Sequence, residues 1–162
     1  MISHRAIMAN VAQAVAADAG VLRYCIEHFG RGLACHVGAY AQGVPGAEES
    51  PFLWIMPEGE NEDQHQDETF TVRMVVGGCV TGPEGQKVIT NVVTPRTEMQ
   101  NGVTVNGGNA VVEDLRDMIL AIVRETKAGA RVSAIRRTEN DIAHFPLEWA
   151  EVHVDYFEPE EL

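Results

Sequence analysis

Four side chains in the N-terminal part of the chain, Cys25, His28, Cys35 and His36, have the chemistry to bind a metal. Cys25 and His28 stand three residues apart, so on a helix they would share a face. Zinc needs four convergent nitrogen or sulfur ligands. Cys35 and His36 are neighbours, and in a strand they would point to opposite faces of the sheet. The spacing therefore predicts buried thiols and surface histidines, and no metal site.

Cys79 could act as a nucleophile if a histidine and a third orienting group lay beside it. His144 and His153 are the candidate bases, and their positions in the sequence do not place either next to the thiol. His153 falls on the polar face of the last expected strand, which predicts a solvated ring. The segment Gly77–Gly82 resembles a nucleotide-binding loop in its glycines. The sequence after it does not predict a helix, whose N-terminus would be needed to bind a phosphate. We therefore predict no catalytic residue and no bound cofactor.

Other signatures of catalysis are missing from the sequence. It has no G-x-S-x-G elbow, no G-x-x-x-x-G-K loop and no H-E-x-x-H pair. Arg136 and Arg137 are the basic pair of the C-terminal third, and we expect them at a solvated strand end.

Length, charge and cysteine content exclude several classes of protein. The 162 residues suit one domain, 1–162. With 12 basic and 24 acidic residues, the net charge is −12, which argues against general nucleic-acid binding through a basic surface. No apolar run is long enough for a transmembrane helix, and no signal-peptide core follows Met1. Three irregularly spaced cysteines do not suggest a disulfide framework, which fits a reducing cytoplasm.

The N-terminal half shows helical and then strand patterns. Apolar residues at helical spacing predict a helix over Ile7–Phe29, broken near Ala19-Gly20 and ended by Gly30. A short strand is expected over Leu33–Tyr40. The compact apolar run Phe52–Met56 predicts a buried strand that closes at Pro57.

The third strand predicted in this half has a clear alternation of apolar and polar residues. Phe70, Val72, Met74 and Val76 share one face of the segment Thr69–Val76, which predicts a half-buried strand. We expect it to pair antiparallel with Phe52–Met56. The connection between them, Glu58–Glu68, has six acidic residues among eleven and no apolar one, so it must be solvated.

The segment 82–108 is rich in glycine, valine and threonine, and we interpret it as a protruding β-hairpin arm. A thin arm cannot bury all its apolar side chains, so we expect it to contact another subunit or a tube. The residues predicted to make that contact are Val92, Val93, Arg96, Val103 and Val105. An equally weighted alternative is that the segment supplies two more strands of the main sheet.

The C-terminal third predicts a helix and two strands. Asn109 to Lys127 carries an apolar stripe, with Asn109 as the expected N-cap. A strand is expected over Arg131–Arg137. In the final strand, Leu147–Phe157, the residues Ala150, Val152, Val154 and Tyr156 should face the core.

The order of these elements resembles the tail terminator, or tail-completion, proteins of long-tailed bacteriophages and prophages. The resemblance covers most of the chain and depends on three stretches. These are the helix Ile7–Phe29, the hairpin Phe52–Met56 with Phe70–Val76 around its charged turn, and Val111–Val123 followed by the closing strand Trp149–Tyr156. The long segment Gly82–Gly108 departs from the shortest members of that family.

The resemblance implies an α+β fold, a small antiparallel sheet with helices on one face; the β-hairpin arm interpreted from 82–108 would project from it. It implies a homo-oligomeric ring, a hexamer, that caps the tail-tube protein and presents the docking surface for head-completion or neck proteins. DNA would pass through without specific binding, and no membrane would be involved. Such a structural, non-enzymatic protein would reside in the virion tail, and in the host cytoplasm during assembly.

Three alternatives stay open at this point. A head–tail connector or neck protein would share the fold and differ in its docking partner. A small cytoplasmic thiol enzyme would use Cys79 with His144 or His153. A monomeric adaptor or binding module would need neither a ring nor a catalytic group.

Overall fold

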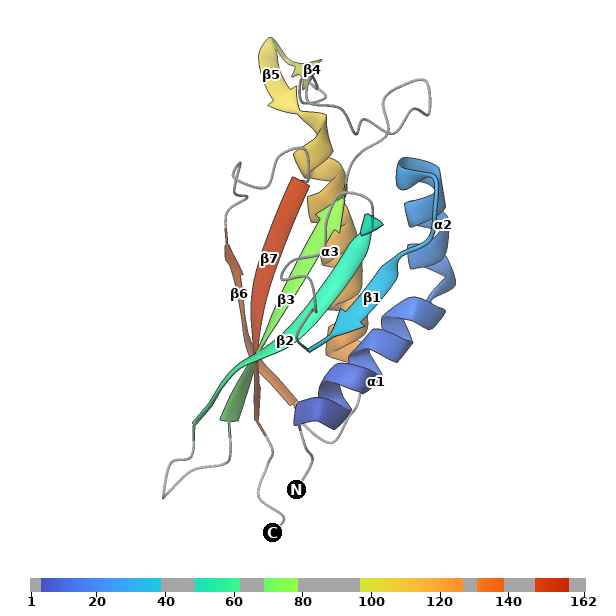
Figure 1. Cartoon of the computed structure of the whole chain (residues 1–162). Helices are drawn as coiled ribbons and strands as arrows, with labels where there is room; N and C mark the ends of the chain where they lie inside the picture. Colours follow the sequence, from blue (N-terminus) through green and yellow to red (C-terminus); the bar gives the residue numbers. More distant parts are fainter. Residues whose placement is uncertain are drawn as a thin grey trace.

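The computed structural model describes residues 4–38, 49–61, 69–78, 97–126, 131–138 and 148–157. The elements in chain order are α1 (His4–Ala17), α2 (Ala19–Phe29), β1 (Ala34–Val37), β2 (Phe52–Asn61), β3 (Thr69–Gly78), β4 (Thr97–Gln100), β5 (Val103–Asn106), α3 (Gly107–Glu125), β6 (Arg131–Thr138) and β7 (Glu148–Phe157). Figure 1 shows the strands of a twisted sheet with the helices stacked behind and beside them. None of the described helices is long and apolar enough to cross a membrane.

The main sheet has five strands in the order β1-β2-β3-β7-β6. The expected α+β class is confirmed, and the hairpin of β2 with β3 is antiparallel as predicted. The expectation of a purely antiparallel sheet is wrong at one strand, because β1 pairs parallel with β2. Residues 38–51 separate the two strands, which is enough chain to return to the starting edge before β2 begins.

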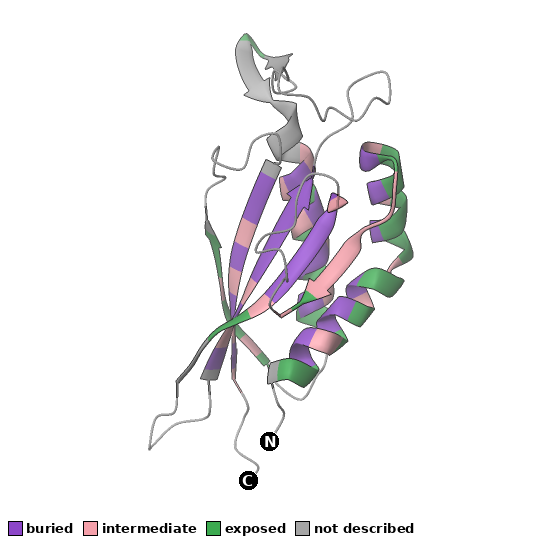
Figure 2. Ribbon diagram, viewed as in Figure 1, coloured by how far each residue is buried: buried purple, intermediate pink, exposed green. Residues whose placement is uncertain are grey.

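All three helices lie on one face of the sheet, and each buries the side that faces the strands (Figure 2). The alternating residues predicted to face inward from β3 and β7 are buried there. They pack with the apolar stripes of the helices, and the largest fully buried side chains include Tyr156, Phe29, Leu53, Ile55, Met74 and Leu115. Hydrophobic burial between one sheet face and its helices therefore holds the fold together.

The break in the N-terminal helix falls at Asp18, one residue before the predicted site. The Asp18 carboxylate accepts a hydrogen bond from the amide of Val21 at 2.9 Å and so caps the start of α2. Gly30 ends α2 with a φ of 78°, a left-handed conformation that favours glycine. The sequence signals for both ends of α2 were thus close to correct.

Two predicted boundaries are wrong. The second strand does not close at Pro57 but continues to Asn61, with a bulge between Pro57 and Gly59. A proline is compatible with a strand where its missing amide faces no partner, and β1 does not extend that far. Helix α3 begins at Gly107, so Asn109 lies inside the helix and is not its N-cap.

The hairpin of β4 with β5 forms a separate two-stranded sheet. Asn101 and Gly102 have φ values of 51° and 79°, as a tight two-residue turn of the Asn-Gly type requires. For residues 97–106, the alternative of two further strands in the main sheet is therefore wrong. Residues 79–96, the rest of the predicted arm, lie outside the described part of the chain.

Candidate functional site

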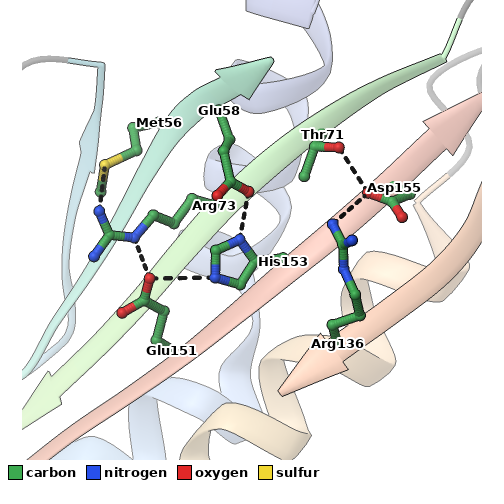
Figure 3. Close-up of polar contacts among 8 residues, drawn as sticks. All are labelled: Met56, Glu58, Thr71, Arg73, Arg136, Glu151, His153 and Asp155. Atoms are coloured by element: carbon green, nitrogen blue, oxygen red, sulfur yellow. Dashed lines mark hydrogen bonds and ion pairs between the residues drawn. The ribbon is translucent and has the colours of Figure 1, made fainter. Parts of the chain in front are cut away.

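The sheet face opposite the helices carries a network of charged side chains at the level where β2, β3, β7 and β6 are all paired (Figure 3). One row of register partners crosses these four strands: Met56, Arg73, His153 and Arg136. Glu58, Thr71, Glu151 and Asp155 complete the network on the neighbouring rows. We call these eight residues the open-face network, because they lie on the face without helices.

His153 lies between two carboxylates. Its Nδ1 faces Glu58 Oε2, and its Nε2 lies 3.3 Å from Glu151 Oε1. Only the imidazolium has two N–H donors, so both contacts are hydrogen bonds only when the ring is protonated. The prediction of a solvated histidine is wrong, since the side chain is 17% exposed and held from both sides.

Arg73 is the cation at the centre of the network. Its Nε donates to Glu151 Oε1, and its Nη1 lies 4.0 Å from Met56 Sδ. Burial alone would raise the pKa of Glu151. The hydrogen bonds from Arg73 and Trp149, with the charges of Arg73 and His153, outweigh burial and hold that pKa below its ordinary value. Glu151 is therefore a carboxylate stabilised in its ionised form.

A second set of contacts links β3, β7 and β6. Asp155 Oδ1 accepts a hydrogen bond from Thr71 Oγ1 at 2.7 Å and from Arg136 Nη2 at 3.0 Å. Arg137, whose backbone pairs with the inward-facing Val152, lies 3.6 Å from Asp117 of α3. Both arginines are exposed near the end of β6, as predicted, and each also has an acidic neighbour.

The open-face network neutralises its own charges. Each arginine of the network contacts a carboxylate, and the histidine contacts two. A phosphate or carboxylate ligand would have to displace these internal partners. The arrangement is therefore suited to cross-linking four strands rather than to binding an anion.

The other end of the same face is apolar. Phe52, Trp54, Val75 and Trp149 form a small buried cluster there. The Trp54 indole N–H donates to the Gly38 carbonyl at 2.7 Å, which ties the residue after β1 to this cluster. The continuous apolar run of β2 is thus explained by burial on both faces of the sheet.

Gly77 and Gly78, in the segment whose sequence resembles a nucleotide-binding loop, have a packing role. A Cβ on Gly77 would lie 2.3 Å from the Phe52 ring, and one on Gly78 would lie 2.4 Å from the Phe29 ring. Adjacent residues of a strand face opposite sides, so each glycine admits one aromatic ring on its own face. Packing against aromatic rings therefore explains why both positions are glycine, and no bound phosphate is needed to explain them.

The four candidate metal ligands occupy α2 and β1. Cys25 is buried, Cys35 is partly buried, and the His28 ring lies against Tyr24 with centroids 4.2 Å apart. Among the described residues, no three His, Cys, Asp or Glu side chains are grouped so as to hold a metal ion.

Burial raises the pKa of several groups near this region. The pKa of Tyr24 is raised to about 12, mainly by burial. The negative charges of neighbouring Asp114, Cys25 and Glu27 raise it further. Its hydroxyl donates to the Val111 carbonyl at 2.9 Å, which joins α2 to α3. Burial, with a smaller effect of Cys35, raises the pKa of Cys25 to about 12.

We expect Cys25 to resist alkylation by iodoacetamide in the native protein at pH 8. At a pKa of about 12, on the order of one thiol in ten thousand is the reactive thiolate at that pH. Burial also raises the pKa of Cys35, so it should react more slowly than a free thiol. Peptide mass spectrometry would measure both rates, with the same reaction in urea as the control. Rapid native modification of Cys25 would contradict this buried placement.

Several predicted residues lie outside the described part of the chain. Cys79 and His144 are among them, as are the predicted contact residues Val92, Val93 and Arg96. Val103 and Val105 lie on β5, where the structure describes the backbone only. The thiol-enzyme constellation and the arm contact therefore stay predictions.

Sequence reasoning missed the role of Arg73 and Glu58. The signal for Arg73 was available, because alternation placed it on the same face as Glu151 and His153 once the strands are paired. Glu58 was assigned to the solvated connection. The strand's extension past Pro57 could not be read from the sequence, and it brings Glu58 to His153.

Comparison with known proteins gives no family assignment. No family model matches the chain. No curated protein matches it either. The function must therefore be argued from the fold and the open-face network.

Proposed function

We propose that this protein is a tail terminator of a long-tailed bacteriophage or prophage. It forms a ring on the head-proximal end of the tail tube, ends tube growth and presents a surface to the head-completion proteins. The observation that carries the proposal is the layered order of elements. The chain order is α1 and α2, then the hairpin β2–β3, then α3, and last the pair β6–β7, which is the order that the resemblance requires. Every described helix lies on one face of the sheet.

The chemistry of the open-face network supports the same proposal. Its cations and carboxylates contact each other across four strands, so they stabilise a surface rather than surround a substrate. A capping protein acts through shape and contact, and it needs a firm sheet with accessible edges. No described helix covers the second face of this sheet.

Deletion of the gene from its phage or prophage tests the proposal. We expect tails with overlong tubes of uncontrolled length and no joined virions, seen by electron microscopy. Complementation with the wild-type gene should restore both tube length and joining. A Cys79→Ala variant should complement equally well, because the proposed role uses no thiol chemistry.

Other outcomes separate the alternatives. Tails of normal length that fail to join heads would replace the terminator role with that of a connector or neck protein. Normal infectious virions would remove any role in virion assembly. Loss of complementation by Cys79→Ala, with the variant folded and assembled, would favour a thiol enzyme.

A further inference from the structure

The five-stranded sheet has two open stretches of edge among its described strands. Strand β6 pairs with β7 on one side and with no other described strand. On the opposite side, β1 covers β2 only over Phe52–Ile55, so Met56–Asn61 has no described partner on its outer side. We call Arg131–Thr138 the basic edge and Met56–Asn61 the acidic edge.

The two edges lie at the same level along the strands. Register partners connect Asn61 through Thr69 and Phe157 to Arg131. The row of Met56, described above, ends at Arg136. A second copy placed beside the first, without a shift along the strands, would therefore bring its acidic edge level with residues Arg131–Arg136 of the basic edge.

Strand direction also suits such a contact. Three successive antiparallel pairings separate β2 from β6, so the two strands run in opposite directions. When one copy is placed beside another in the same orientation, β6 of the first runs antiparallel to β2 of the second. Antiparallel addition of a strand to an exposed edge is a common mode of association.

Charge separates the two edges. The basic edge contains Arg131, Arg136 and Arg137 and no acidic residue, in a chain with twice as many acidic as basic residues. Arg136 and Arg137 are 59% and 44% exposed, and Asp117, the partner of Arg137, also contacts Arg116. Arg131 is exposed and forms no ion pair with a described residue, so it leaves excess positive charge at this edge.

The acidic edge has the opposite character. It contains Glu58 and Glu60 and no basic residue. Glu58 is 40% exposed although it contacts His153. Like charges would oppose contact of two basic edges or of two acidic edges, whereas one edge of each kind attracts.

We propose that the basic edge of one copy pairs antiparallel with the acidic edge of a second copy, which continues the sheet from subunit to subunit. The contact uses two different surfaces, so it is head-to-tail and can close into a ring. Closure into a ring, rather than an open chain, rests on the proposed function. Both edges contain a bulge, between Pro57 and Gly59 and between Val132 and Ala134, which disfavours pairing with an arbitrary strand.

Charge reversal tests this contact in the full chain. Sedimentation velocity over a concentration series should show association of the wild-type protein. Arg131→Glu should raise its dissociation constant at least tenfold. Adding Asn61→Arg, on the row level with Arg131, should restore association, because the new arginine then lies opposite the new glutamate. Arg23→Glu, on the exposed side of α2, is the matched control and should leave association unchanged.

Cross-linking gives a second readout that does not depend on affinity. Gly59 and Ala134 lie on one row, so Gly59→Cys protein mixed with Ala134→Cys protein should form a disulfide-linked dimer of the two variants. Neither variant alone should cross-link through its new cysteine. Association unaffected by Arg131→Glu, no recovery with Asn61→Arg, or a wild-type monomer with no mixed cross-link would each overturn the contact.

The two proposals fail in different ways. If Arg131→Glu protein still associates and still terminates tails, the edge contact is wrong and the proposed function stands. If the gene deletion leaves tails normal while Arg131→Glu abolishes association, the edge contact stands and the tail role is wrong.

Discussion

Replacing Phe29 with alanine should lower the free energy of unfolding by about 3–5 kcal/mol. Phe29 is the last residue of α2, and its ring is 1% exposed. The ring lies over Gly78 of β3, so it ties the end of the helix to the end of a central strand. Since a domain of this kind is stable by about 5–15 kcal/mol, such a loss would leave little margin at 37 °C.

Gly78→Ala in the wild-type chain should be destabilising for the complementary reason. The added Cβ would lie 2.4 Å from the Phe29 ring, which forces the ring or the strand to move. Overpacking of this type costs about 1–3 kcal/mol. In the Phe29→Ala background the ring is gone, so the same substitution should be neutral or stabilising because it fills part of the cavity.

Urea unfolding monitored by the fluorescence of the two buried tryptophans, Trp54 and Trp149, would measure all four members of this cycle. Gly77→Ala is the matched control. The Cβ added at Gly77 would contact the Phe52 ring, on the sheet face opposite Phe29. The Gly77→Ala substitution should therefore remain destabilising whether or not Phe29 is present. An equal cost of Gly78→Ala in both backgrounds would contradict the packing of Phe29 on Gly78.

The fold was predictable where local pattern and burial agree. The alternation of β3 and β7 identified their inward-facing residues, because one face of each strand meets the helices. Local pattern could not reveal that β1 joins parallel to β2, since pairing direction depends on how residues 38–51 return the chain. The extension of β2 past Pro57 likewise depends on β3 as a partner and not on the sequence of β2 itself.

The open-face network was only partly predictable. Period-two alternation placed Glu151, His153 and Asp155 on a polar face, which the structure confirms. The opposing residues on β3, Thr71 and Arg73, could not be assigned, because they lie more than seventy residues away in sequence and depend on register. A one-residue change of register would send Arg73 to the helix side of the sheet and remove the network altogether.

Arg73→Met should lower the free energy of unfolding at pH 7 by about 1–3 kcal/mol, the penalty expected when a partly buried polar group loses its main partner. Glu151 is only 16% exposed, and Arg73 is its closest cation. Methionine keeps much of the aliphatic packing of arginine, so the loss would report on the charge and the hydrogen bond rather than on volume.

The effect should depend on pH with a definite sign. The folded-state pKa of Glu151 lies below its ordinary value of 4.5, so its contribution to stability is fully present above about pH 4.5. That contribution is lost as the pH falls through the folded-state pKa, because the protonated carboxyl is neutral and is no longer attracted to the Arg73 charge. The stability difference between wild type and Arg73→Met should therefore be largest near neutral pH and shrink on acidification.

Urea unfolding at a series of pH values from 7 downward would measure this difference. Arg136→Met is the matched control, since Asp155 keeps its hydrogen bond from Thr71 and Arg136 is 59% exposed. An exposed pair of this kind contributes about 0–1 kcal/mol. Glu151→Gln added to Arg73→Met should recover part of the loss and flatten its pH dependence, because the unpaired charge is then gone. A difference that stays constant with pH would show that Arg73 stabilises the sheet through packing alone, and the ionised Arg73–Glu151 pair would then have no part in holding β3 to β7.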